Sequence, residues 1–270
     1  MSTSGAVRGA GWSSLRLGVS LALAYRMEVL VQVLSASLII LLNWCLWTAI
    51  FDGRDQVAGR GGLELTTYVV VAWIATTFYA NRLDQELAER FRTGLVAVDL
   101  LRPWNLQLHL YLRDLGRALV ALPWVTLPVA LWTALLLPLR VPVDPGTWLL
   151  VGLSLLLAHG ISFGISWIFG VLSFRLRNAA GLGHLKGTLI ALCSGALIPL
   201  DLYPEVLRDL VLLLPFQGMS HVPANLFVEH MAGTDRLLAL GSQVAWVMVL
   251  ALFGRWLFGR ACRQLAVQGG

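Results

Sequence analysis

Long apolar stretches separated by short polar ones dominate the chain. The six longest are residues 27–51, 63–80, 109–138, 147–174, 187–200 and 237–258. A helix needs about 20 apolar residues to cross the hydrocarbon of a bilayer, so this pattern predicts six transmembrane helices, of which the fifth is short. Two prolines, Pro123 and Pro128, should bend the third. We therefore expect an all-α integral membrane protein in which residues 1–270 form a single membrane domain.

Two further segments are predicted to lie at the membrane surface. Residues 8–25 mix Trp12 and several leucines with arginine and serine, a composition typical of an interfacial helix. Residues 201–215 contain Pro204, which favours the start of a helix, and end at Pro215, which stops one. The apolar run between these prolines is too short to cross, so we expect a short re-entrant helical hairpin after the fifth span.

The longest charged run is residues 82–103, RLDQELAERFRTGLVAVDLLRP, which follows the second span. Its apolar residues recur at helical spacing: Leu83, Leu87 and Phe91. On the opposite side Glu86 and Arg90 can pair at i, i+4, whereas Gly94 should end the helix and Pro103 close the following apolar turn. The pattern predicts a helix over 82–93 with one apolar stripe. The alternative is a solvated loop whose charges only keep it out of the lipid.

The fourth span carries small and polar residues on one helical face. They are His159, Ser162, Ser166, Gly170 and Ser173. Small and hydroxyl residues at this spacing predict close packing against another helix. An ionisable residue within the membrane is a functional hypothesis by default, so His159, Ser162 and Ser166 are assigned either to a transport path or to packing.

Composition agrees with the membrane assignment and limits the function. The chain is 57% hydrophobic and 13% charged, with a mean hydropathy of +0.74, which leaves no room for a soluble enzyme domain. If the N-terminus is cytoplasmic, fifteen of the 20 basic residues lie on the cytoplasmic side, which favours both termini there. The partner that these basic residues suggest is membrane lipid, in the anionic cytoplasmic leaflet. The segment 52–62, which carries two of the other five, is predicted to be a flexible polar loop on the far side.

The sequence contains no pattern for nucleotide, metal or nucleophilic chemistry. The nearest match to a phosphate-binding loop, residues 181–188 (GLGHLKGT), has the wrong spacing. The three cysteines are far apart, and the histidines are scattered, so we expect no catalytic residue, metal site or nucleic-acid partner. A serine protease would need a histidine near Ser194, and the last span has none.

Two stretches carry a family resemblance. Residues 94–103 (GLVAVDLLRP) resemble the segment after the second span of bacterial ABC-2 type permeases. Residues 199–204 (PLDLYP), with Leu207, Arg208 and residues 213–216 (LLPF), resemble the segment after their fifth span. Residues 217–221 (QGMSH) depart from the family pattern, in which smaller apolar residues are expected.

The resemblance implies the membrane half of an ABC exporter in the bacterial cytoplasmic membrane. Two permease subunits, identical or homologous, would form the substrate path, and each would rest on a separate ATP-binding subunit. ATP and Mg would bind that subunit, so this chain is expected to hold no cofactor. The alternative is a stand-alone carrier using His159, or a scaffold, with no ATPase partner. The sequence does not select a substrate.

The resemblance also implies roles for particular residues. Residues 82–93 and the turn to Pro103 correspond to the main coupling helix, whose apolar ridge would fit a groove of the ATPase, and the basic loop 175–186 to a second contact. The residues expected to couple are Leu83, Glu86, Leu87, Arg90, Phe91, Asp99, Arg102, Pro103, Arg175 and Arg177. The outer gate would consist of Pro199, Asp201, Tyr203, Pro204, Arg208, Pro215 and Phe216.

Overall fold

A computed structural model of the chain describes residues 26–51, 56–57, 60–101, 105–176 and 179–268. The predicted interfacial helix at 8–25 lies outside the described residues, as do Arg102, Pro103 and Arg177. The backbone of Arg175 is described, but its side chain is not.

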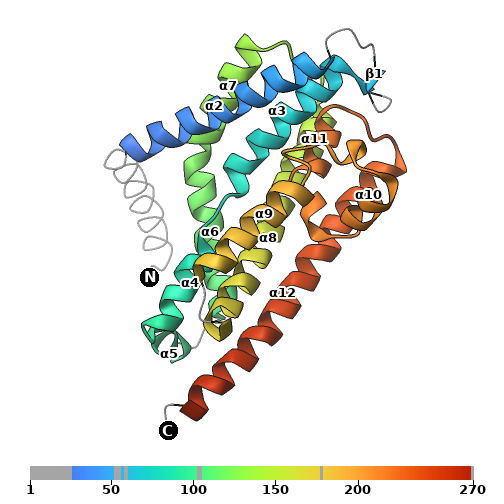
Figure 1. Ribbon diagram of the computed structural model, residues 1–270. Helices are drawn as coiled ribbons and strands as arrows, with labels where there is room; N and C mark the ends of the chain where they lie inside the picture. The colour runs from blue at the N-terminus through green and yellow to red at the C-terminus, as the bar shows by residue number, and fades with distance from the viewer. Residues whose placement is uncertain (1–25, 52–55, 58–59, 102–104, 177–178, 269–270) are drawn as a thin grey trace, which may run out of the picture.

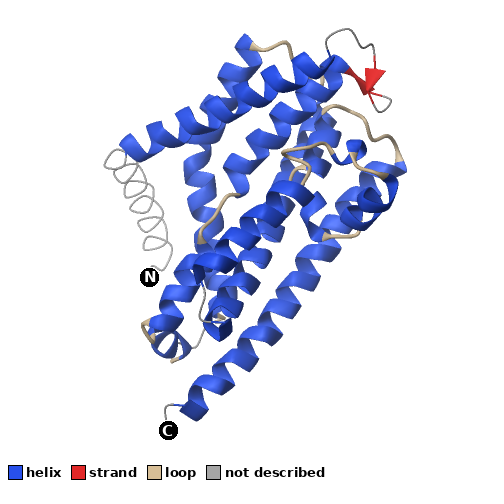
Figure 2. Ribbon diagram, in the orientation of Figure 1, coloured by secondary structure: helices blue, strands red, loops and turns tan. Residues whose placement is uncertain are grey.

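Five helical segments in the described part are long and apolar enough to cross a membrane. They include α2 (Arg26–Phe51), α3 (Gly62–Tyr79), α6 (Leu106–Ala121) with its continuation α7 (Leu127–Leu136), α8 (Pro145–Leu176) and α12 (Thr234–Gln268). The chain is therefore an all-α, multi-pass membrane protein, as predicted. Figure 2 shows that helices make up nearly all of the described structure, with one small pair of strands.

The third span is interrupted where prolines predict it. A π-helical segment, Leu122–Thr126, joins α6 to α7 and contains Pro123, and Pro128 follows in the first turn of α7. Proline has no backbone N–H, so the regular i to i−4 ladder cannot continue through these positions.

The predicted fifth span differs from the structure. The helix there is α9 (Ala179–Cys193), which begins earlier than residue 187 and ends before residue 200. Its 15 residues rise about 22 Å, whereas the hydrocarbon core is about 30 Å thick. The six-span count is therefore not confirmed. The chain turns just after α9 at Gly195, whose φ of +82° suits a residue without a side chain.

The segment after α9 contains more helix than predicted. The 3-10 turn η2 (Leu200–Leu202) is followed by α10 (Glu205–Leu212), which starts directly after Pro204 as expected. The sequence pattern predicts a loop over residues 216–235, before the last span. The 3-10 turn η3 (Pro215–Gly218) and α11 (His221–Phe227) lie there instead. That prediction was wrong because seven residues, nearly all buried, display no amphipathic period.

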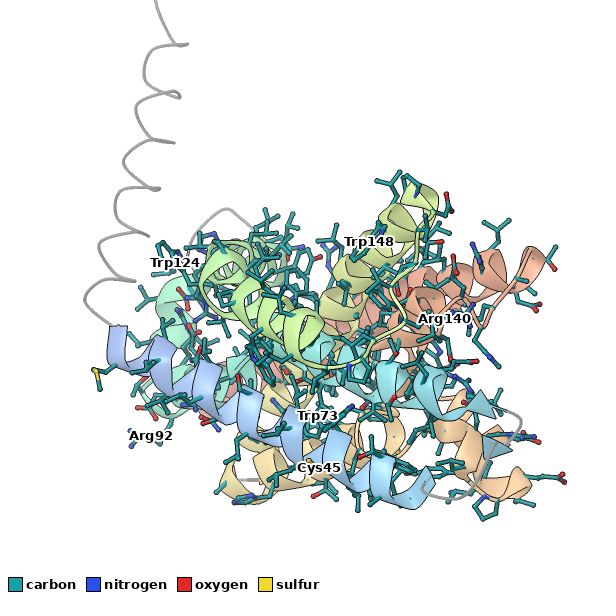
Figure 3. The ribbon with its side chains drawn as sticks, turned by 90° about the horizontal axis from the view of Figure 1, so that it is seen from above. Cys45, Trp73, Arg92, Trp124, Arg140 and Trp148 are labelled. Atoms are coloured by element: carbon teal, nitrogen blue, oxygen red, sulfur yellow. The ribbon has the colours of Figure 1, made fainter. Side chains whose placement is uncertain are left out.

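The helices form a bundle with two distinct ends (Figure 1). At one end, here the α5 end, lie α4 (Leu83–Arg92), α5 (Leu95–Leu100) and the C-terminal part of α12. At the other, the α10 end, lie α10, α11 and the ribbon of β1 (Gln56–Val57) paired antiparallel with β2 (Arg60–Gly61). Viewed from above, α2 runs along one side of the bundle with Cys45 on it (Figure 3).

The core is centred on α8. Trp167, Ile161 and Ala158 are fully buried there, whereas many leucines of α2, α6 and α12 are exposed. The small residues allow the close packing that the sequence predicts. A Cβ at Gly164 would lie 2.7 Å from the Leu250 side chain of α12, and one at Gly160 would lie 3.1 Å from Val247. Polar groups inside and leucines outside are typical of a bundle surrounded by lipid.

Candidate functional site

A helical hairpin, α4 and α5, forms the α5 end of the bundle. The helix predicted over 82–93 is present as α4, and Gly94 ends it with a φ of +75°. The left-handed conformation costs little for glycine, so the chain reverses there without strain. The following residues form α5 and not only the predicted apolar turn.

The apolar stripe of α4 is used inside the chain. Leu83, Leu87 and Phe91 are at most 4% exposed and share a cluster with Trp167 and Val171 of α8. The expectation that this ridge fits a groove of a partner protein is therefore wrong. The stripe is the only apolar face of α4, and the transmembrane helices already cover it.

Gly170 lets α4 approach α8 closely. A Cβ at this position would lie 2.9 Å from the Cβ of Leu87 and 3.1 Å from the Cα of Asp84. The second contact is with backbone, which cannot rotate away. Gly170 was assigned by sequence to a packing face, and the structure identifies its neighbour as α4.

Ion pairs join the polar face of α4 to its neighbours. Glu86 accepts hydrogen bonds from Arg90 at 3.0 Å and from Arg113 of α6 at 2.5 Å. Arg90 also donates to Asp99 of α5 at 2.5 Å. The predicted Glu86–Arg90 pair is thus part of a network that links α4, α5 and α6.

A buried ion pair joins α4 to α9. The Lys186 ammonium donates to Asp84 Oδ1 at 2.5 Å and to Ser166 Oγ at 3.3 Å, and both charged side chains are about nine-tenths buried. The sequence pattern placed Lys186 in a basic loop that contacts a partner, and this placement was wrong. Lys186 lies inside α9 and faces the acidic residue of a helix 102 positions away in sequence, a pairing that local pattern does not reveal.

The outer face of the hairpin is exposed and partly apolar. On α5 and the residue after it, Leu95, Val98 and Leu101 are 51%, 51% and 85% exposed. Polar Glu89 and Arg92 of α4 are exposed and pair with each other at 2.6 Å. The sequence pattern assigns a coupling role to Asp99 of α5 but not to Leu95, Val98 or Leu101. Their i, i+3, i+6 spacing was the available signal, since it places them on one side of a short helix.

The intramembrane histidine faces a carboxylate. His159 is 1% exposed, and its Nε2 lies 3.6 Å from Oδ2 of Asp114 on α6, with the rings of Phe78 and Tyr111 beside it. Neither ring nitrogen has a hydrogen-bond partner among the described residues. Ser162 lies on the same face and donates to the Tyr79 carbonyl at 2.8 Å. The α8 face therefore contacts α3 and α6 inside one subunit.

A second ionic cluster lies at the α10 end. Arg60 of β2 is 1% exposed and donates to Asp201 of η2 at 2.6 Å. Its other terminal nitrogen lies 3.7 Å from Glu64, which is 2.8 Å from His230 Nδ1. The segment 52–62 was predicted to be a flexible polar loop, but its described part includes this buried arginine. Asp201 was predicted to belong to the outer gate, and it is held in place by Arg60.

Next to this cluster, Tyr68 of α3 forms contacts with α11 and with the turn after α9. The Tyr68 hydroxyl donates to the Gly195 carbonyl at 3.1 Å and lies 2.9 Å from His221 Nδ1. Burial lowers the pKa of His221 to about 4, so the ring is neutral near pH 7. A neutral ring suits a contact with a hydroxyl in a buried site.

The other predicted gate residues are distributed around this cluster. Tyr203 donates to the Leu192 carbonyl at 2.8 Å, and Pro199, Pro215 and Phe216 are buried. Pro204 is exposed, and the Arg208 side chain pairs with its neighbour Asp209 at 3.4 Å. The structure thus brings the predicted gate residues to one end of the bundle, opposite the α4–α5 hairpin (Figure 1).

A comparison with protein families covers nearly the whole chain. The model of the ABC-2 family transporter protein matches residues 20–269. The chain belongs to this family. The permease is thus a membrane component of an ABC transporter, a class of subunit that is generally non-catalytic and associates with ABC ATP-binding subunits. Searches of curated proteins and of solved structures found no match.

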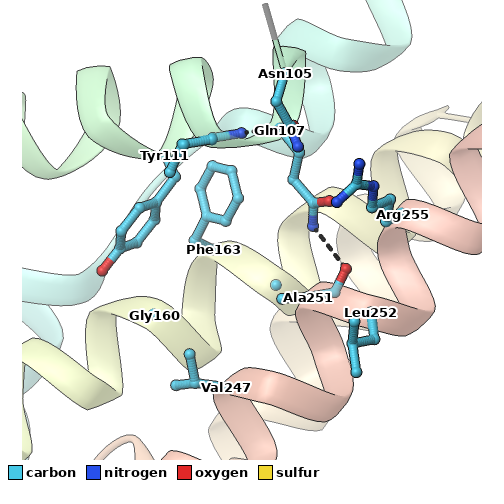
Figure 4. A pocket seen from close by; sticks show the side chains of 11 residues that line it. Asn105, Gln107, Tyr111, Gly160, Phe163, Val247, Ala251, Leu252 and Arg255 are labelled. Atoms are coloured by element: carbon cyan, nitrogen blue, oxygen red, sulfur yellow. Dashed lines mark hydrogen bonds between the residues drawn. The ribbon is translucent and has the colours of Figure 1, made fainter.

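The permease also contains a pocket between α6, α8 and α12 (Figure 4). Its volume is about 310 Å³, and its lining is mainly apolar. The residues lining it include Asn105, Gln107, Tyr111, Phe163, Val247 and Arg255. A hydrogen bond from Gln107 Nε2 to the Ala251 carbonyl, 3.2 Å long, joins α6 to α12 across it.

Proposed function

We propose that this permease is the transmembrane subunit of an ATP-driven exporter and that the outer face of its α4–α5 hairpin seats the ATP-binding subunit in the cytoplasm. One observation carries the proposal. The inner face of the hairpin is fixed to α6, α8 and α9, while its outer face presents Leu95, Val98 and Leu101 beside charged residues. An exposed apolar patch with a polar rim is typical of a protein interface.

The attachment of the hairpin gives a route for coupling. ATP and Mg would bind the partner subunits, whose closure would push on α5. Because α4 contacts α8 without a gap at Gly170 and is linked to α9 through Lys186, a push would move the transmembrane helices together with the hairpin. Packed helices switch between discrete arrangements more readily than they deform, so the movement would reach the far end of the bundle.

The exporter would contain two permease subunits with the substrate path between them. At the extracytoplasmic side the segment 199–216 would form the gate, and the contact between Arg60 and Asp201 would hold it closed. The distribution of basic residues in the sequence supports a cytoplasmic location for the α5 end and both termini. The resemblance to bacterial ABC-2 type permeases supports the bacterial inner membrane as its location.

Purification of the tagged permease from gently solubilised native membranes tests this proposal. Mass spectrometry should find an ATP-binding subunit at about one per permease. Val98→Asp should reduce the recovered ATP-binding subunit about tenfold, because it places a charge in the apolar patch. Val143→Asp is the matched control: Val143 is 93% exposed in the loop before α8, at the opposite end, and its change should have no effect.

A permease recovered alone, under conditions that keep a known transporter complex intact, would contradict the proposal. The second candidate function would then be a stand-alone carrier. The observation that favours it is the buried pair of His159 and Asp114, two ionisable side chains facing each other within the transmembrane bundle. Loss of transport in His159→Ala, with the fold intact, would support the carrier.

A further inference from the structure

The pocket between α6, α8 and α12 has one polar end. Asn105, Gln107 and Arg255 gather there, whereas Tyr111 and Val247 lie farther along the pocket (Figure 4). Arg255 is exposed, and it has no acidic partner within 4.0 Å in the part of the chain that the structure describes. The pocket therefore combines an apolar interior with one uncompensated positive charge at its end.

Aromatic side chains locate this end at the membrane surface. Phe253 and Trp256, which flank Arg255 on α12, are 46% and 53% exposed and stack on each other at 5.5 Å. Arg260 lies over the Trp256 ring at 4.9 Å. Exposed tryptophan with arginine is typical of the headgroup layer, so Arg255 lies at the depth of lipid phosphates.

The pocket extends from this depth into the bilayer. Val247 and Arg255 are eight residues apart on α12, which corresponds to about 12 Å along the helix. One leaflet contributes about half of a hydrocarbon core of roughly 30 Å. The apolar part of the pocket thus spans most of one leaflet, the length over which an acyl chain is extended.

We propose that this pocket binds one anionic phospholipid, with an acyl chain between Tyr111, Phe163 and Val247 and its phosphate on Arg255. The positive charge of Arg255 favours an anionic lipid over a zwitterionic one. A zwitterionic headgroup carries its own cation, which cancels much of the attraction of one arginine, whereas an anionic headgroup does not. A site of this kind would fix the position of α6 relative to α12, and it requires neither an ATPase partner nor export.

The experiment measures lipids retained by the permease in native mass spectrometry. The purified permease is incubated with equal amounts of phosphatidylglycerol and phosphatidylcholine. One phosphatidylglycerol should remain bound in preference to phosphatidylcholine by about fivefold, the factor expected for one basic residue at an anionic surface. Arg255→Gln should remove this preference. Ala251→Phe, which fills the pocket, should lower retention of both lipids about fivefold.

Two matched variants serve as controls. Arg260→Gln removes the same charge from the same helix but outside the pocket, and Ala245→Phe enlarges a different exposed alanine of α12. Both should retain phosphatidylglycerol like the unmodified permease. Equal retention of the two lipids, or an equal loss of preference in Arg255→Gln and Arg260→Gln, would overturn the proposal. So would a dimer that Ala251→Phe dissociates, since a second copy would then occupy the pocket.

Discussion

Lys186→Met is expected to destabilise the permease by about 3–5 kcal/mol, the cost of leaving a buried charge without its partner. Asp84 is 6% exposed and has Lys186 at 2.5 Å, so removal of the ammonium strands the carboxylate between α4 and α9. Thermal unfolding in detergent, followed by tryptophan fluorescence, would show the loss as a lower midpoint. Because the pair joins α4 to α9, less ATP-binding subunit should also co-purify with the variant.

The double variant Asp84→Asn with Lys186→Met separates the charge effect from the loss of packing. It contains no unpaired charge, so it should be more stable than Lys186→Met alone by roughly 2 kcal/mol. If the double variant were less stable than the unmodified permease by the sum of the losses in the two single variants, Asp84→Asn and Lys186→Met, the two side chains would act independently. The buried pair would then not be what holds α4 on α9.

Gly170→Val is expected to cost about 1–3 kcal/mol or more, because it inserts side-chain atoms into a filled contact. The new Cβ would lie 2.9 Å from Leu87 Cβ and 3.1 Å from the Asp84 backbone, so α4 must move away from α8. Displacement of α4 should carry α5 with it. We therefore expect a lower unfolding midpoint together with weaker recovery of the ATP-binding subunit.

Gly152→Val provides the control on the same helix. A Cβ at Gly152 meets nothing within 4 Å, and valine has a better helix propensity than glycine, so the midpoint should stay level or rise slightly. Equal midpoints for the Gly170 and Gly152 variants would show that α4 and α8 are not in tight contact.

The sequence predicted those parts of the fold that depend on local pattern. The spans follow from long apolar stretches, the end of α4 from Gly94, the start of α10 from Pro204, and the tight contacts of α8 from its glycines and serines. Each of these features is encoded by residues within a few turns of one another. Long-range pairings carry no such local signal.

The errors in the candidate site arose from pairings across the chain. The apolar stripe of α4 was assigned to a partner protein because an apolar face predicts burial but does not identify the surface that buries it. In the structure, Trp167 of α8 packs against this stripe. Lys186 and Arg60 were placed in polar loops because their carboxylate partners, Asp84 and Asp201, are more than 100 residues away in sequence. Short buried α11 shows no period, so it too was missed.

In the proposed exporter, the exposed face of α5 contacts an ATP-binding subunit. A photocrosslinking residue placed at Leu101, which is 85% exposed, tests this contact most directly in intact membranes, with the same residue at Val143 as the control at the opposite end. We expect the Leu101 position to capture an ATP-binding subunit and the Val143 position not to do so. If the crosslinker at position 101 captured only lipid while the ATP-binding subunit was present in the same membranes, the proposed contact between α5 and that subunit would be contradicted.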